Sequence, residues 1–173
     1  AIILIPGFAC SGDVWNQTVD SLRSNYTCYI LTMPGFAGTA SEANPSFDNW
    51  TKQIADFIRN EKINKPILIG HSMGGGLALN IASTQPNLVK SIVVVDALPC
   101  LTAIYNPNFQ SRKISDDEFA KAGAQLLGME EEQFRRQAYI SAVSLTTDSL
   151  RYDELVKWSL TSDRQTYAKM YYD

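Results

Sequence analysis

The sequence predicts an α/β fold, in which a doubly wound, mostly parallel sheet is followed by a helical segment. Short apolar runs alternate with amphipathic stretches over residues 1–99, which is the pattern of a sheet covered by helices. The runs are rich in β-branched residues and continuously apolar, as expected of parallel strands that are buried on both faces. With 173 residues, of which 45% are hydrophobic and 19% charged, the chain can bury one sizeable core.

The predicted elements follow one another in β-α-β-α-β-α-β order. The third helix carries Leu77, Ala78 and Ile81 on one face, and Pro86 just after its end prevents its continuation. Four strands are predicted at 2–5, 28–31, 67–69 and 91–95, and three helices at 13–24, 47–61 and 73–84.

After Pro99 the sequence contains no convincing strand and predicts several helices. Two segments, 115–118 and 162–165, fit the capping-box pattern, in which a Ser hydroxyl and a Glu or Gln side chain satisfy unpaired amides at a helix start. We therefore expect a core at 1–99 and a helical cap or lid at 100–173.

Composition excludes several classes of function. A net charge of -3 and a pI near 5.2 leave no excess of basic residues to neutralise phosphates, so we expect no nucleic-acid partner. No apolar run approaches the roughly 20 residues that a membrane span needs. Cys10, Cys28 and Cys100 lack CxxC or Cys/His spacing, so we expect no metal and no cofactor. Nothing in the sequence indicates a cellular compartment.

The most informative segment is Gly-His-Ser-Met-Gly at 70–74, a Gly-x-Ser-x-Gly motif between a buried strand and an apolar helix. A strand-to-helix turn this tight forces the serine, Ser72, into a strained backbone conformation and projects its hydroxyl outward. Side chains at the two glycines would collide with the neighbouring strand and helix. The amide of Met73 falls in the first turn of the helix, where unpaired N–H groups and the helix dipole stabilise negative charge.

With the segments around it, this motif resembles the α/β-hydrolase family over residues 1 to about 99. Residues 2–8 resemble the family's strand and oxyanion loop, with Pro6 where a His commonly precedes the glycine. Residues 31–38 are similar to its Asp-x-Pro-Gly-x-Gly loop, with Thr32 in place of the Asp. Residues 91–96 resemble the strand that follows the nucleophile helix.

The resemblance implies roles for four residues. Ser72 would attack an acyl carbon, and the backbone amides of Phe8 and Met73 would form the oxyanion hole. The other interpretation of Phe8 is an ordinary buried aromatic. Asp96 stands where some family members place the catalytic acid, although a carboxylate that caps the turn at 97–99 is the simpler explanation.

A catalytic base is harder to find, because the single histidine is His71, directly before the nucleophile. Adjacent residues at a strand end point to opposite sides, so we expect His71 to pack beside the sheet and bond to backbone. In the family the triad histidine follows strands that come after the cap. We therefore expect the fold to be incomplete at both ends, with the catalytic His and the missing strands supplied by sequence outside the chain or by another chain.

The leading interpretation is a serine hydrolase that acts on a small ester or related acyl substrate through an acyl-enzyme at Ser72. The alternative is a non-catalytic ligand-binding protein on the same scaffold, which the missing histidine favours. The loop at 35–45 suits an active-site rim. Aromatic residues of the cap are candidates for a pocket wall, although at helical spacing most suit the cap core better: Phe109, Phe119, Phe134, Tyr139, Tyr152 and Trp158.

Overall fold

The structure is a computed structural model that describes residues 1–98, 106, 108 and 115–172. Its sheet has four parallel strands in the order β2-β1-β3-β4. The four predicted strands are therefore found together in one parallel sheet. The strands are β1 (Ile2–Ile5), β2 (Cys28–Ile30), β3 (Ile67–His71) and β4 (Ser91–Val95).

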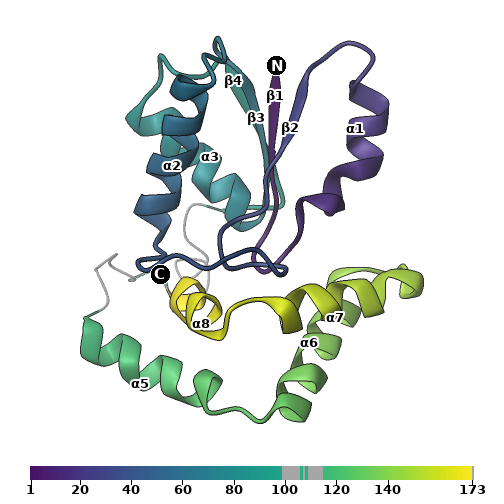
Figure 1. The fold of residues 1–173 in the computed structure, drawn as a ribbon, viewed down its shortest axis with the longest axis vertical. Coiled ribbons are helices and arrows are strands. Elements are labelled where there is room, and N and C mark those ends of the chain that lie inside the picture. Colours follow the sequence, from purple (N-terminus) through teal and green to yellow (C-terminus); the bar gives the residue numbers. More distant parts are fainter. Residues whose placement is uncertain (99–105, 107, 109–114, 173) are drawn as a thin grey trace.

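Helices cover both faces of the sheet, so the fold is doubly wound as predicted. Figure 1 shows α2 and α3 on one face and α1 on the other. Because side chains alternate along a strand, Ile3 and Ile5 of β1 face the core under α2 and α3, whereas Ile2 and Leu4 pack with Trp15. The helices of this part are η1 (Gly12–Trp15, a 3-10 turn), α1 (Asn16–Leu22), α2 (Phe47–Asn60) and α3 (Met73–Thr84).

The two outer strands expose apolar side chains. Ile30 of β2 is 40% exposed, and Val93 and Val95 of β4 are 46% and 40% exposed. Val93 and Val95 point to the same face of β4, because side chains alternate along a strand, so the described part of the chain leaves one face of this strand uncovered. The faces of a parallel sheet are normally covered.

The second part of the described chain is helical and lies beyond the carboxyl ends of the strands (Figure 1). Ser115 and Glu118 form the predicted capping box. The second predicted box is wrong in its capping residue: Asp163, not Ser162, accepts the amide of Thr166, at 2.8 Å. The helices are α5 (Asp116–Leu127), α6 (Glu131–Leu145), η2 (Ser149–Arg151), α7 (Tyr152–Thr161) and α8 (Arg164–Tyr172).

Backbone hydrogen bonds tie the junction of α7 and α8 to the loop after β2. The amide of Asp163 donates to the carbonyl of Gly35 at 2.7 Å, and the amide of Gly38 donates to the carbonyl of Thr161 at 3.1 Å. The hydroxyl of Ser162 accepts the amide of Ala37 at 3.0 Å. This loop, predicted to be a rim, therefore holds α8 against the carboxyl end of the sheet.

Candidate active site

Ser72 occupies the turn between β3 and α3 with φ 52° and ψ -122°, so the predicted positive φ is confirmed. This region is unfavourable for a residue with a side chain, and it persists where the surroundings fix the backbone. Here the Ser72 amide donates to the Val95 carbonyl at 2.9 Å, and the Ser72 carbonyl accepts the amide of Gly75 at 2.8 Å. The half-buried side chain makes no hydrogen bond to a described residue.

The two glycines of the motif are required by space, as predicted. A methyl group on Gly70 would lie 2.6 Å from the amide nitrogen of Gly75 in the first turn of α3. One on Gly74 would lie 2.5 Å from the carbonyl oxygen of Pro6. Both distances are too short for a carbon atom, so β1, β3 and α3 can meet this closely only with glycine at these positions.

The amides of Met73 and Phe8 have no acceptor among the described residues. Met73 is the first residue of α3, where a helix leaves its N–H groups unpaired. Phe8 lies in the loop after β1, where Ala9 has φ 55° and the amide of Cys10 donates to the carbonyl of Gly7 at 3.3 Å. That these two amides converge on one point stays a prediction.

Gly7 brings this loop against Ser72. A Cβ placed on Gly7 would stand 3.4 Å from the Cβ of Ser72 and 3.0 Å from Nδ1 of His71. The loop backbone can therefore approach Ser72 because residue 7 has no side chain.

The ring of Phe8 is held in an aromatic cluster. It packs edge to face against Tyr167 of α8 at a centroid distance of 4.5 Å, against Phe36 at 5.1 Å and against Tyr171 at 5.9 Å. The contact with α8 could not be predicted from the sequence, because nothing in the pattern of either segment pairs them.

His71 lies beside Gly7, and its half-buried ring makes no hydrogen bond to a described residue. The expected backbone hydrogen bond of this ring is thus not found in the described part of the chain. Asp96 follows Val95 directly, at the end of β4, with φ 46° and an exposed side chain. Because the Val95 carbonyl accepts the Ser72 amide, Asp96 and Ser72 lie at the same edge of the sheet.

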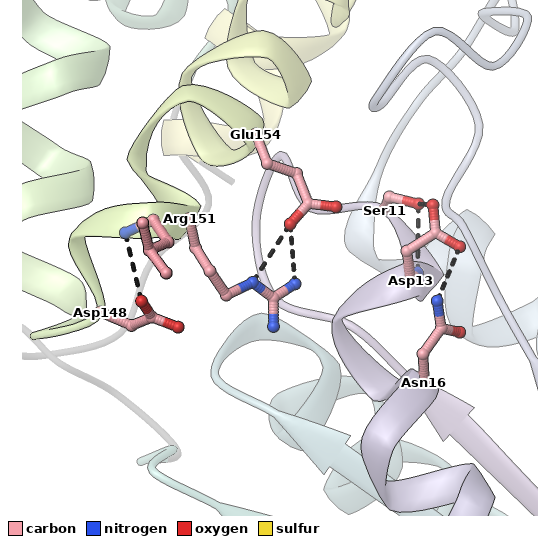
Figure 2. Close-up of polar contacts among 7 residues, drawn as sticks. Ser11, Asp13, Asn16, Asp148, Arg151 and Glu154 are labelled. Carbon is pink, nitrogen blue, oxygen red and sulfur yellow. Dashed lines mark hydrogen bonds and ion pairs between the residues drawn. The ribbon is translucent and has the colours of Figure 1, made fainter.

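Polar side chains lie near the end of the loop after β1 (Figure 2). The Ser11 hydroxyl donates to Asp13 at 2.9 Å, and Arg151, at the start of α7, donates through Nε and Nη2 to one oxygen of Glu154 at 3.1 and 2.9 Å. Burial raises the pKa of the Cys10 thiol to about 11, and the positive charge of Arg151 partly opposes the shift. Cys10 and Cys28 are free thiols.

Of the aromatic residues predicted as candidates for a pocket wall, the structure describes the side chains of four. Phe109 and the side chain of Phe119 lie outside the described residues. Phe134 and Trp158 are buried, and Tyr139 packs against Tyr152 at 5.9 Å. Tyr139 and Tyr152 thus belong to the packing of α6 on α7, whereas Phe134 packs in a cluster with Leu126 of α5 and Ala168 of α8.

A surface cavity of about 470 Å³ opens away from these residues, between the loop after β2 and α8. Residues 41–43 and 45 of the loop predicted to be a rim line it, whereas Ser72, Phe8, Met73 and Asp96 do not. In the described part of the chain, no group of three or more His, Cys, Asp and Glu side chains is placed to hold a metal ion. None of the described helices combines the length and the apolar character that crossing a bilayer requires.

A model of the alpha/beta hydrolase fold matches residues 1–170. The chain belongs to this family. The pimeloyl-[acyl-carrier protein] methyl ester esterase of Citrobacter koseri is 28% identical over 102 residues, which cover 59% of this chain and 38% of that protein. The protein of Vibrio campbellii with the same name is 29% identical over 59% of this chain and 39% of its own length. The chain thus spans about two-fifths of the length of the curated relatives it matches.

Solved structures show the same fold in longer chains. An esterase from Rhodococcus sp. ECU1013 has a TM-score of 0.74 and 18% identity, covering 98% of this chain and 63% of that one. The fold of this α/β-hydrolase is therefore the one that the sequence predicts, and Ser72 stands at its strand-to-helix turn.

Proposed function

We propose that this α/β-hydrolase is a serine hydrolase that cleaves a carboxylic ester or related acyl substrate through an acyl-enzyme at Ser72. The proposal rests on the backbone conformation of Ser72, which has a positive φ at the turn between β3 and α3. A strained conformation of this kind is kept where it serves to present a side chain. The methyl ester esterases to which the chain is similar support an ester as the substrate class.

In this mechanism the Ser72 hydroxyl attacks the acyl carbon while its proton passes to a base. The carbonyl electrons move to oxygen, and the amides of Met73 and Phe8 stabilise the oxyanion. When the oxyanion collapses, the ester C–O bond breaks, the alcohol leaves with the proton, and the acyl group stays on Ser72. Water then attacks the acyl-enzyme with the help of the same base and releases the acid.

The base belongs outside this chain in our proposal. His71 precedes the nucleophile, and its ring has no hydrogen bond to a described residue. Among the described residues β2 and β4 are the outer strands of the sheet, and Val93 and Val95 leave one face of β4 exposed. Both features suit further strands and helices, which sequence outside the chain or another chain would supply together with the histidine. Residues 100–173 then form the cap over the site held by 1–99.

Asp96 is our candidate for the carboxylate that orients the base. It stands one residue beyond the carbonyl that holds the Ser72 amide. If it has this role, Asp96→Asn in the full-length protein lowers kcat by a factor on the order of 10⁴. Activity of Asp96→Asn close to wild type would place the acid elsewhere.

The proposal is tested with a serine-reactive fluorophosphonate probe and a short-chain p-nitrophenyl ester, using the full-length gene product. We expect labelling and turnover in the wild type and neither in Ser72→Ala. Ser83→Ala, which removes an exposed hydroxyl from the same helix, is the matched control and keeps both. Absence of labelling in a folded wild type that still binds an acyl ligand would instead support a non-catalytic binding protein.

A further inference from the structure

The ring of Tyr167 lies closer to the ring of Phe8 than any other aromatic side chain of the Phe8 cluster. Their centroids are 4.5 Å apart and their planes are inclined by 73°. This is the edge-to-face geometry in which aromatic pairs attract one another beyond simple burial. Phe8 belongs to the loop after β1 and Tyr167 to α8, so the pair joins the helical part of the molecule to the loop that faces Ser72.

Tyr167 also contacts α6. Its ring packs edge to face against Phe134 of α6 at 5.2 Å, and Phe134 is fully buried. The guanidinium of Arg164 covers the Phe134 ring at 3.5 Å. On the other side of Phe8, Phe36 packs against Trp50 at 5.2 Å. The Phe8 ring therefore packs between Phe36 of the main core and Tyr167, which in turn packs against Phe134 of α6.

We infer that Tyr167 is a positioning residue for the backbone amide of Phe8. The inference rests on the proposed function, in which this amide is a donor to the oxyanion. Side chain and amide belong to one residue, so a shift of the ring moves the N–H. An oxyanion donor must stand about 2.7–3.1 Å from the oxygen, and a misplacement of about 1 Å can cost a factor of about 100 in rate.

The loop is held at its two ends, where the Pro6 carbonyl contacts Gly74 and the Gly12 amide donates to Oγ1 of Thr32 at 2.9 Å. Between these ends the backbone hydrogen bond from Cys10 to Gly7 is long, at 3.3 Å, and Ala9 takes a positive φ of 55°. Packing of the Phe8 ring therefore adds to the restraints on this middle part of the loop. The Tyr167 hydroxyl makes no hydrogen bond to a described residue, so the ring and not the hydroxyl carries the effect.

Loss of the Tyr167 ring should leave α8 in place, because other contacts dock this helix. Met170 is buried in the main core cluster, and the Asp163 amide donates to the Gly35 carbonyl at 2.7 Å. A change in rate on removing the ring would then report on the loop beside Ser72 rather than on detachment of the helix.

The experiment compares Tyr167→Ala, Tyr167→Phe and Tyr172→Ala in the full-length protein. Tyr172 is the matched control, since it lies on the same helix and contacts Tyr171 but has no ring contact with Phe8. We measure kcat and KM for a short-chain p-nitrophenyl ester, and the inhibition constant of a trifluoromethyl ketone, which forms a tetrahedral oxyanion on a serine. Tyr167→Ala should lower kcat by about 10- to 100-fold and weaken the ketone by a similar factor, with KM changed less than about 3-fold. Tyr167→Phe and Tyr172→Ala should stay within about 3-fold of wild type in all three quantities.

The inference is overturned if Tyr167→Ala keeps its kcat, if its loss lies in KM alone, or if Tyr172→Ala loses as much. Should Tyr167→Ala fail to fold, Tyr167→Leu replaces it under the same criteria. Ser72→Ala separates this inference from the proposed function: activity in Ser72→Ala refutes the acyl-enzyme, whereas an inactive Ser72→Ala beside a fully active Tyr167→Ala refutes the positioning role alone.

Discussion

Gly74 and Pro6 are in backbone contact, since a methyl group on Gly74 would stand 2.5 Å from the Pro6 carbonyl oxygen. This contact presses the first turn of α3 against the end of β1. The Met73 amide begins that turn, and the loop with Phe8 leaves that strand, so one close approach sets the distance between the two proposed oxyanion donors.

Gly74→Ala should therefore damage both stability and reactivity. The new methyl group forces the helix away from β1, and overpacking of this kind costs about 1–3 kcal/mol in the free energy of unfolding. We expect a lower denaturation midpoint in urea and weaker fluorophosphonate labelling of Ser72. Gly76→Ala is the control. Its methyl group would meet a side-chain ring, that of Phe47 at 3.2 Å, rather than backbone atoms. Alanine also favours a helix over glycine by about 1 kcal/mol. Equal behaviour of the two variants would contradict the steric explanation.

A second prediction concerns Arg164, which connects α8 to the end of α5. Its Nη1 donates to the carbonyls of Leu126 at 3.2 Å and Met129 at 3.4 Å, and its guanidinium covers Phe134. Arg164→Ala removes both hydrogen bonds and uncovers the ring, although the Leu126 carbonyl keeps the amide of Met129 at 3.4 Å. It should lower the free energy of unfolding by about 1–3 kcal/mol.

Arg164→Lys should recover less than half of that loss, because an ammonium cannot stack on the ring and reach two carbonyls together. Arg135→Ala removes an exposed pair with Glu131 at 3.8 Å and should leave thermal unfolding unchanged. Full recovery by lysine would show that charge alone matters.

A third prediction uses two glycines of the loop after β2. Gly35 and Gly38 have φ 81° and 82°, so alanine costs about the same backbone strain at each. A methyl group on Gly35 would lie 2.6 Å from Oγ1 of Thr166 in α8, whereas one on Gly38 would find no atom closer than 3.8 Å. Gly35→Ala should therefore unfold at a lower temperature than Gly38→Ala. Coincident melting curves would mean that the loop does not press on α8.

The sheet could be predicted from the sequence because the signal of a buried parallel strand, a short run of apolar β-branched residues, lies within the strand itself. Strands 2–5 and 91–95 are confirmed to the residue. The strand at 67–69 runs on to His71, because pairing with β4 continues to His71 opposite Val95, and a glycine and a histidine do not look like a buried strand. The helix predicted from 13 opens with a 3-10 turn and continues as α1.

Contacts between distant segments could not be predicted in this way. Local spacing predicts Ser162 as a helix cap. In the structure its hydroxyl instead donates to the Trp158 carbonyl and accepts the Ala37 amide. Only the docked loop provides the Ala37 amide as a partner. The motif at 70–74 gave the position and conformation of Ser72, since that geometry is local. The packing of Tyr167 on Phe8 depends on where α8 lies, and no local pattern encodes it.

The last prediction concerns Cys10, next to the loop that carries Phe8. Burial raises the pKa of its thiol from 9.0 to about 11, although the charge of Arg151 opposes the shift. Below pH 9 the thiol is protonated in both the folded and the unfolded chain. Between about pH 9 and 11 the unfolded chain releases the proton while the folded protein keeps it, so unfolding becomes easier as pH rises.

The thiol should thus cost the folded protein about 2–3 kcal/mol of stability across that interval. The measurement is urea unfolding at pH 8 and at pH 11, comparing Cys10→Ala with the parent, both in a Cys28→Ser, Cys100→Ser background that leaves one thiol. Groups away from Cys10 titrate equally in the two proteins, so their contribution cancels in the difference, whereas Tyr167 differs because burial raises its pKa and charge on Cys10 adds to that shift. The parent should lose more stability than Cys10→Ala between the two pH values, and its alkylation by iodoacetamide should rise only near pH 11. Parallel stability curves, or rapid alkylation of folded protein at pH 8.5, would show that Cys10 is solvated and its pKa ordinary.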